Sequence, residues 1–149
     1  MKLKSLYKTK TLEFYASDTS TTLNIPYFEN GVSAGFPSPA EDHRHSKIDL
    51  NNLLIENPSA TYYVRVNGDS MSGAGILSGD LLIVDRSIEV SNNCIVVAHL
   101  DGEFTVKRIQ KKGRQLFLKP ENETFKPIQI TEEMDFKVWG VVTHIIHKV

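Results

Sequence analysis

The chain contains a single cysteine, Cys94, among its 149 residues. One thiol excludes an intramolecular disulfide and is typical of a reducing compartment, so we expect a cytoplasmic protein. The residues after Cys94 are apolar and β-branched, which favours a packing role for the thiol over a reactive one. Long apolar runs are also absent, and the basic N-terminus has no apolar signal core, so the sequence indicates neither a membrane span nor a secretion signal.

An excess of charge of either sign is missing as well. The 17 basic and 18 acidic residues leave a formal net charge of −1. Such a balance gives no electrostatic footprint for nucleic acid and no polybasic patch for a membrane, so we expect no direct sequence-specific DNA binding and no membrane partner. We interpret a small basic cluster, Lys111, Lys112 and Arg114, as a solvated hairpin tip rather than a nucleic-acid site.

Residues 1–47 differ in composition from the rest of the chain. They are rich in Ser, Thr, Lys and Asn, and prolines interrupt any regular period. We therefore expect an extended arm with little structure of its own, whose apolar patches at 12–15 and 25–28 are able to dock on a folded surface. His43 and His45 alternate like metal ligands, but no third ligand is evident nearby, so we interpret them as linker residues and predict no metal site and no cofactor.

From Ile48 onward the pattern changes to short strands. Asp49 is placed to cap a short helix over 50–55, which Pro58 would end. Runs of β-branched and aromatic residues then predict strands, and Asp101-Gly102 is typical of a tight hairpin. The predicted strands cover residues 62–66, 81–84, 95–100, 103–109, 115–118 and 138–146. Many short strands with little helix indicate an all-β domain of barrel or sandwich-like architecture.

Two segments of this domain suggest a catalytic pair, namely the turn Gly68-Asp69-Ser70-Met71 and the predicted strand that carries Lys107. Serine is a weak nucleophile until a base removes its proton. Of the five histidines, His43 and His45 lie in the expected linker and His144 and His147 at the last predicted strand, so only His99 stays a candidate for that base. For Lys107 to serve instead, its pKa must fall from about 10.4 to ~7–8, a shift worth about 4 kcal/mol that burial among apolar neighbours favours.

Each segment also has an ordinary structural interpretation. Gly-Asp-Ser is a common turn sequence, and a strand lysine is usually solvated. The segment Val32–Pro37 has the composition of a flexible linker. Only the combination of serine, lysine and a small-residue junction favours catalysis over these interpretations.

The sequence blocks that contain these residues resemble the LexA/UmuD family of self-cleaving serine peptidases. Within that family the resemblance is to the UmuD branch, the accessory subunits of error-prone SOS DNA polymerases. It runs from about Gly35 to about His147, whereas residues 1–33 match poorly. The blocks that carry it, in order, are Gly35-Phe36-Pro37-Ser38-Pro39-Ala40, Ile48-Asp49-Leu50-Asn51, Asn57-Pro58-Ser59-Ala60-Thr61-Tyr62, Gly79-Asp80-Leu81-Leu82-Ile83-Val84-Asp85, Asp101-Gly102-Glu103-Phe104-Thr105-Val106-Lys107 and Trp139-Gly140-Val141-Val142.

The resemblance implies that Ser70 is the nucleophile, that Lys107 is its general base, and that the cut falls between Ala34 and Gly35. Small side chains at that junction let the scissile backbone enter a tight site. The backbone N–H groups of Ser70 and Met71 are natural donors to the oxyanion. The expected organisation is an arm of residues 1–34 removed by self-cleavage, a linker over 35–47, and an all-β Ser-Lys peptidase and dimerisation domain over 48–149.

The same resemblance implies partners. Cleavage would be SOS-induced and stimulated by a RecA filament on single-stranded DNA, and the cleaved homodimer would serve as the accessory subunit of a Y-family translesion DNA polymerase. A binding module that acts only through its dimer and polymerase contacts stays an alternative. A LexA-like repressor needs a helix-turn-helix ahead of the cut, and residues 1–34 show no capped amphipathic helices. A type I signal peptidase shares the Ser-Lys chemistry but needs a membrane anchor, and because the sequence indicates no membrane span we do not favour this alternative.

Overall fold

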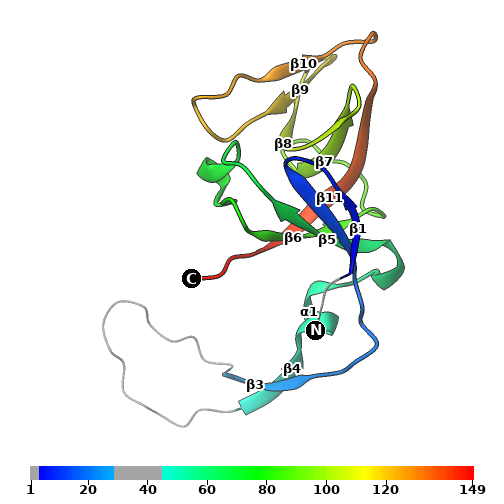
Figure 1. Cartoon of the computed structure of the whole chain (residues 1–149), viewed down its shortest axis with the longest axis vertical. Helices are drawn as coiled ribbons and strands as arrows, with labels where there is room; N and C mark the ends of the chain where they lie inside the picture. The colour runs from blue at the N-terminus through cyan, green and yellow to red at the C-terminus, as the bar shows by residue number, and fades with distance from the viewer. Residues whose placement is uncertain (1–3, 29–44) are drawn as a thin grey trace. The chain divides into compact units, whose positions relative to one another are not determined.

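Residues 4–28 and 45–149 are described by the computed structural model, and they divide into two units (Figure 1). The larger unit comprises Met1–Ser17 with Asn57–Val149, and the smaller unit is Asp18–Glu56. Ser70 and Lys107 both belong to the larger unit, so that unit alone positions the predicted catalytic pair.

The larger unit is built on one antiparallel sheet of nine strands, joined in the order β1-β2-β5-β6-β11-β7-β8-β9-β10. The last strand in sequence, drawn from orange to red in Figure 1, pairs with both β6 and β7. The predicted all-β fold is confirmed. The elements are β1 (Ser5–Lys8), β2 (Leu12–Ala16), η1 (Pro58–Ala60), β5 (Thr61–Val66), η2 (Ser72–Ala74), β6 (Leu81–Asp85), β7 (Ile95–Leu100), β8 (Glu103–Lys112), β9 (Gln115–Lys119), β10 (Ile128–Ile130) and β11 (Phe136–Ile146).

Strands β6 and β7 form the buried middle of the sheet. The continuous apolar run in β6 predicted a strand covered on both faces, and Leu82, Ile83 and Val84 are at most 1% exposed. In β7, Val97 packs in one apolar cluster while its neighbours Val96 and Ala98 pack in another. Since successive side chains of a strand point to opposite faces, both faces of β7 are covered.

The hairpin between β7 and β8 fixes the register of the strand that carries Lys107. Asp101 and Gly102 both have positive φ, 47° and 86°, as the two central residues of a type I′ turn require. The turn pairs Leu100 with Glu103, and the same register places Lys107 opposite the fully buried Val96. The predicted hairpin is thereby confirmed, and it directs the lysine into the interior.

The next turn, between β8 and β9, is a solvated tip as predicted. Gly113 has a φ of 60° there, a left-handed conformation that glycine adopts without steric cost. Lys111, Lys112 and Arg114 around it are exposed.

The smaller unit holds a two-stranded sheet and one short helix. Its elements are β3 (Asn24–Phe28), β4 (His45–Asp49) and α1 (Leu50–Leu54). The Asp49 carboxylate accepts a hydrogen bond from the Asn51 backbone N–H at 3.3 Å, so the predicted cap and helix are confirmed. Of the two histidines considered as metal ligands, His43 lies outside the described residues and His45 begins β4.

The N-terminal arm differs from its prediction of little regular structure. Residues 5–16 form β1 and β2, and Leu12 and Phe14 of β2 are only 2% and 3% exposed. The expected docking of the 12–15 patch therefore takes the form of strand pairing with β5. Composition alone missed this because the stabilising hydrogen bonds come from a distant strand. The short strand β10 was missed for the same reason.

Candidate active site

Ser70 lies on a turn between β5 and η2 that the loop after β9 holds in place. Glu121 accounts for two of the contacts: its N–H donates to the Ser70 carbonyl at 2.8 Å, and its carbonyl accepts from the Gly73 N–H at 2.6 Å. The Asn122 side chain donates to the Asp69 carbonyl at 2.9 Å. A Cβ at Gly73 would lie 2.6 Å from the Glu121 carbonyl oxygen, so only glycine permits this close approach.

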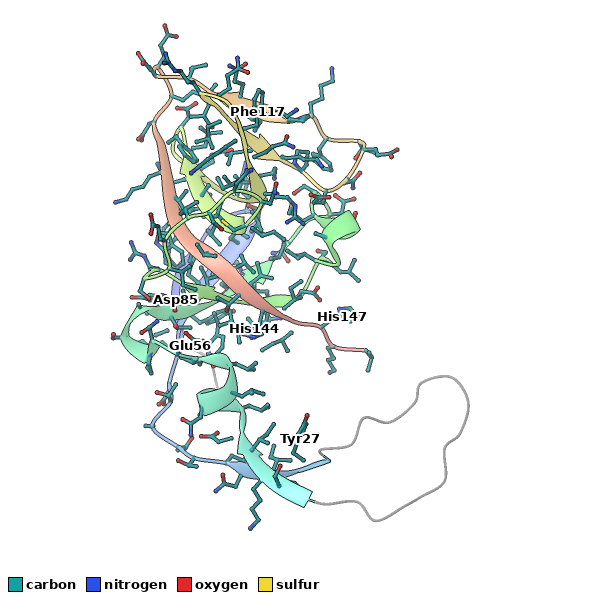
Figure 2. All side chains as sticks on the ribbon, turned by 180° about the vertical axis from the view of Figure 1, so that it is seen from behind. Tyr27, Glu56, Asp85, Phe117, His144 and His147 are labelled. Atoms are coloured by element: carbon teal, nitrogen blue, oxygen red, sulfur yellow. The ribbon has the colours of Figure 1, made fainter. Side chains whose placement is uncertain are left out.

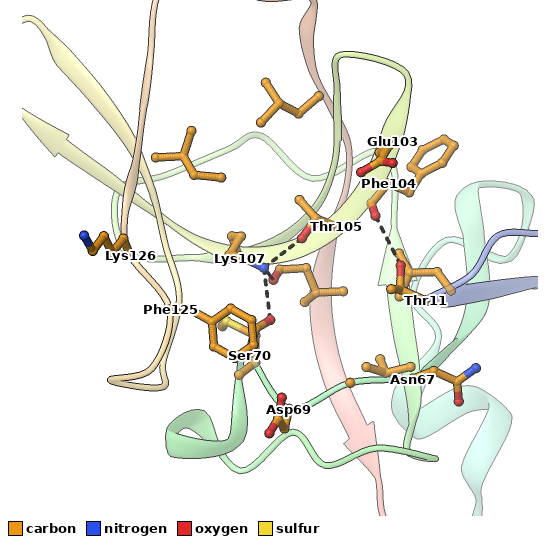
Figure 3. A pocket seen from close by; sticks show the side chains of 17 residues that line it. Thr11, Asn67, Asp69, Ser70, Glu103, Phe104, Thr105, Lys107, Phe125 and Lys126 are labelled. Atoms are coloured by element: carbon orange, nitrogen blue, oxygen red, sulfur yellow. Dashed lines mark hydrogen bonds between the residues drawn. The ribbon is translucent and has the colours of Figure 1, made fainter.

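Lys107 meets the serine from β8. Its Nζ lies 3.0 Å from Ser70 Oγ, 2.8 Å from Thr105 Oγ1 and 3.0 Å from the Val106 carbonyl oxygen (Figure 3). Thr105 precedes Lys107 by two residues in the strand, so both side chains share one face. A neutral amine has two N–H donors and one lone pair. These three partners match it when the amine donates to Thr105 and Val106 and accepts from the Ser70 hydroxyl.

The surroundings of the amine favour that neutral form. Lys107 is only 8% exposed, and burial lowers the pKa of its ammonium below the ordinary value. Among the described residues, no carboxylate forms an ion pair with it. An ion pair would oppose the effect of burial, so its absence from this part of the chain leaves the pKa lowered.

Arg108, the next residue of β8, connects the lysine strand to the serine turn. Its Nε donates to Glu121 Oε1 at 2.5 Å, and its Nη1 donates to the Asn93 carbonyl at 2.7 Å. Lys119, which pairs with Arg108 across the strands, also lies 3.9 Å from the same carboxylate oxygen. The Glu121 carboxylate therefore offsets two cations. Because the Glu121 backbone also bonds the serine turn, this residue connects that turn to the strand that carries Lys107.

A groove of about 470 Å³ opens beside the pair. Its apolar lining includes Leu12, Met71, Phe104, Phe125 and Ile128, contributed by segments far apart in the sequence. Ser70 and Phe125 both line this groove (Figure 3). The size and apolar character fit an extended stretch of backbone with small side chains.

Within the described parts of the chain, neither the Ser70 nor the Met71 backbone N–H donates a hydrogen bond. Met71 is 2% exposed, so its N–H is not freely solvated. Both groups are available for an oxyanion, the role predicted for them.

The structure thus brings Ser70, Met71 and Lys107 together. Ala34 and Gly35 lie outside the described residues. His99, the other candidate base, points elsewhere: its Nδ1 lies 3.9 Å from Asp135 Oδ2. Its ring packs on Phe104 and it does not line the groove.

Sequence analysis missed the supporting residues Thr105, Gly73 and Glu121. The two-residue spacing to Lys107 was a signal for Thr105, because alternate residues of a strand share a face. Gly73 and Glu121 meet only through tertiary folding, so the sequence carries no local signal for their contact.

Two features that bear on other kinds of site can be stated for the described residues. They include no cluster of three or more His, Cys, Asp or Glu side chains placed to share a metal ion. No helix among them has the length and apolarity that crossing a bilayer requires.

An all-β domain with a serine turn beside an apolar groove fits the peptidase class. The family model described as Peptidase S24-like matches residues 26–143, and the chain belongs to this family. The family predicted from the sequence motifs is thereby confirmed.

Named relatives agree with this assignment. Protein MucA of Salmonella typhimurium is 42% identical over 132 residues, covering 88% of this chain and 90% of the relative. Protein SamA of Salmonella typhimurium strain LT2 is 46% identical over 123 residues, covering 83% of this chain and 85% of the relative. The LexA repressor of Colwellia psychrerythraea is 42% identical over 118 residues, which is 77% of this chain but only 54% of the repressor.

Proposed function

We propose that this protein is a serine peptidase that cuts its own chain between Ala34 and Gly35. In this proposal Ser70 is the nucleophile and Lys107 is the general base. The observation that carries it is the 3.0 Å contact between Lys107 Nζ and Ser70 Oγ, made by an amine that is buried without a carboxylate partner in the described chain.

The proposed reaction has two steps. Neutral Lys107 takes the proton of Ser70 as Oγ attacks the carbonyl carbon of Ala34, and the Ser70 and Met71 N–H groups stabilise the oxyanion. The protonated amine then gives that proton to the leaving amine of Gly35, and the Ala34 acyl group stays on Ser70. Water hydrolyses this ester with Lys107 again acting as the base, which restores the Ser70 hydroxyl and breaks the last covalent bond between residues 1–34 and the C-terminal product that begins at Gly35.

Tethering explains how a two-residue site suffices. The scissile bond is part of the same chain, so effective concentration replaces binding affinity. Each molecule needs one turnover only, and a slow rate is adequate.

The biological role we propose follows the family resemblance. Cleavage belongs to the SOS response in the cytoplasm and is stimulated by a RecA filament on single-stranded DNA. The cleaved homodimer then serves as the accessory subunit of a Y-family DNA polymerase in translesion synthesis. The match to MucA and SamA over most of this chain supports placing it with such proteins.

Stimulated cleavage tests this role. The purified chain is incubated at neutral pH with RecA filaments assembled on single-stranded DNA, and the Gly35–Val149 product is followed by mass spectrometry. We expect faster cutting with filaments than with RecA lacking DNA, and none in Ser70→Ala. Equal rates with and without DNA would remove the SOS trigger from the proposal while leaving the peptidase in place.

A further inference from the structure

The arm is tied to the larger unit by a buried strand. β2 pairs with β5 from Leu12 opposite Val66 to Ala16 opposite Tyr62. Leu12, Phe14 and Tyr15 of β2 are 2%, 3% and 8% exposed. Such a strand is part of the core, since its apolar side chains are removed from water as fully as those of central strands.

Further contacts hold the two ends of β2. The Asn67 N–H donates to the Thr11 carbonyl at 2.7 Å, and the Ser17 hydroxyl lies 2.8 Å from the Thr61 carbonyl oxygen. Phe14 packs edge-on against Phe104 and Trp139, with ring centroids 5.0 and 4.8 Å away. The arm therefore combines main-chain pairing with aromatic packing.

A second pairing lies in the smaller unit. β3 pairs with β4 from Asn24 opposite Asp49 to Phe28 opposite His45. In sequence, the Ala34–Gly35 bond falls between these two strands. A cut there leaves β3 on one fragment and β4 on the other, as it leaves β2 and β5 on opposite fragments.

We infer that cutting at Ala34–Gly35 yields a nicked protein in which residues 1–34 remain bound to residues 35–149 through the β2–β5 and β3–β4 pairings. This inference rests on the proposed function for the identity of the cut bond. Cleavage and loss of the arm are then two separate events, and the second needs a partner or a process that strips β2 from the sheet.

Retention has a consequence for the groove. Thr11 and Leu12 of the arm line it beside Ser70 and Lys107. The retained fragment therefore keeps the groove wall complete after cleavage. Loss of the arm would remove that wall and expose the unpaired edge of β5, which is the kind of edge that another strand can join.

Native mass spectrometry of the cut chain tests the inference. One sample is wild-type protein that has cut itself during incubation at pH ~10, which favours the neutral form of Lys107, and has been returned to neutral pH. A second is Ser70→Ala carrying a site for a sequence-specific protease at the Ala34–Gly35 junction, cut by that protease. We expect two fragments under denaturing conditions but one complex of both under native conditions, in each sample.

The outcomes separate the inference from the proposed function. Fragments that separate under native conditions, in either sample, would overturn retention. An uncut wild-type chain would count against self-cleavage, whereas the externally cut sample would still decide retention.

A matched pair of variants in the externally cut chain locates the holding contacts. Phe14→Asp places a charge at a side chain that is 3% exposed, and we expect it to increase the released fraction about tenfold or more, because burying an unpaired charge is strongly unfavourable. Leu23→Asp makes the same kind of change at a side chain that is 66% exposed and should leave release unchanged. Equal release from both variants would contradict the role assigned to β2.

Discussion

Replacing Gly73 by alanine should slow self-cleavage without unfolding the protein. The new Cβ would lie 2.6 Å from the Glu121 carbonyl oxygen, whereas ordinary contact begins near 3.4 Å. The serine turn or the loop after β9 must therefore move by up to about 0.8 Å. The same move lengthens the 2.6 Å hydrogen bond from the Gly73 N–H to that oxygen by up to about 0.8 Å and so weakens it.

The size of the effect follows from geometry. A misplacement of about 1 Å at a reacting group costs roughly 10²-fold in rate, so we expect a 10- to 100-fold slower cut. Overpacking of this kind costs about 1–3 kcal/mol of stability, which a typical domain survives. The assay is the first-order loss of intact chain by mass spectrometry, with the stability of each variant measured by denaturant unfolding.

Gly113→Ala is the matched control. Gly113 has a φ of 60° and no atom within 4 Å of an added Cβ, so alanine there costs about 1–2 kcal/mol of backbone strain far from Ser70. We expect wild-type cleavage from this variant. A wild-type rate for Gly73→Ala, or equal slowing in both variants, would refute the idea that Glu121 positions the serine turn.

Three further predictions concern charged side chains of the larger unit. Because burial lowers the pKa of Lys107, the folded state binds fewer protons than the unfolded state, so stability should rise with pH between the folded-state pKa and about 10.4. Lys107→Met should abolish this rise and stabilise the protein at pH ~7, as denaturant unfolding at several pH values would measure. An unchanged slope of unfolding free energy against pH would contradict this prediction. Glu121→Gln keeps the backbone contacts of residue 121 but removes the carboxylate that Arg108 binds, so we expect slower cleavage. The pH midpoint of cleavage should not shift, since the pKa of Lys107 is lowered by burial. Wild-type cleavage kinetics would show that the Arg108–Glu121 contact does not position the serine turn.

The last of the three concerns Asp80, which is 3% exposed and lies 2.6 Å from the ring of His147, just past the end of β11 (Figure 2). Burial pushes the pKa of Asp80 up, but the hydrogen bonds from His147 and the Leu77 N–H outweigh it and hold the pKa below its usual range. This stability is present above the unfolded pKa of about 3.9 and is lost as pH falls through the folded-state value. His147→Ala should therefore raise the midpoint pH of acid unfolding, measured by circular dichroism. The control His144→Ala changes an exposed residue and should leave that midpoint unchanged. Equal midpoints for the two variants would show that the Asp80–His147 contact does not stabilise the protein.

The sequence predicted the parts of this structure that local chemistry determines. Asp101-Gly102 supplies the positive φ angles of the hairpin, and the apolar run of β6 requires burial on both faces. Because the hairpin fixes register, it also determines which face of β8 carries Lys107. The motif pairing of Ser70 with Lys107 is matched by the 3.0 Å contact, although their catalytic role stays a prediction.

What the sequence could not predict depends on distant partners. The arm was expected to lack structure because its composition is polar, yet β5 offers it hydrogen bonds and a buried site for Phe14. The contact between Gly73 and Glu121 likewise joins two turns from separate parts of the sheet. No local pattern encodes either pairing, since both depend on tertiary proximity.

The most direct test of the central proposal is the intact mass of the purified chain after incubation at pH ~10, where more of a lysine of lowered pKa is neutral than at pH ~7. Lys107→Met is compared with Lys111→Met, which removes an exposed lysine from the same strand. We expect wild-type and Lys111→Met to yield fragments that end at Ala34 and begin at Gly35, and Lys107→Met to stay whole. An uncut wild-type chain, or cutting at the same bond in Lys107→Met, would contradict the Ser70–Lys107 pair.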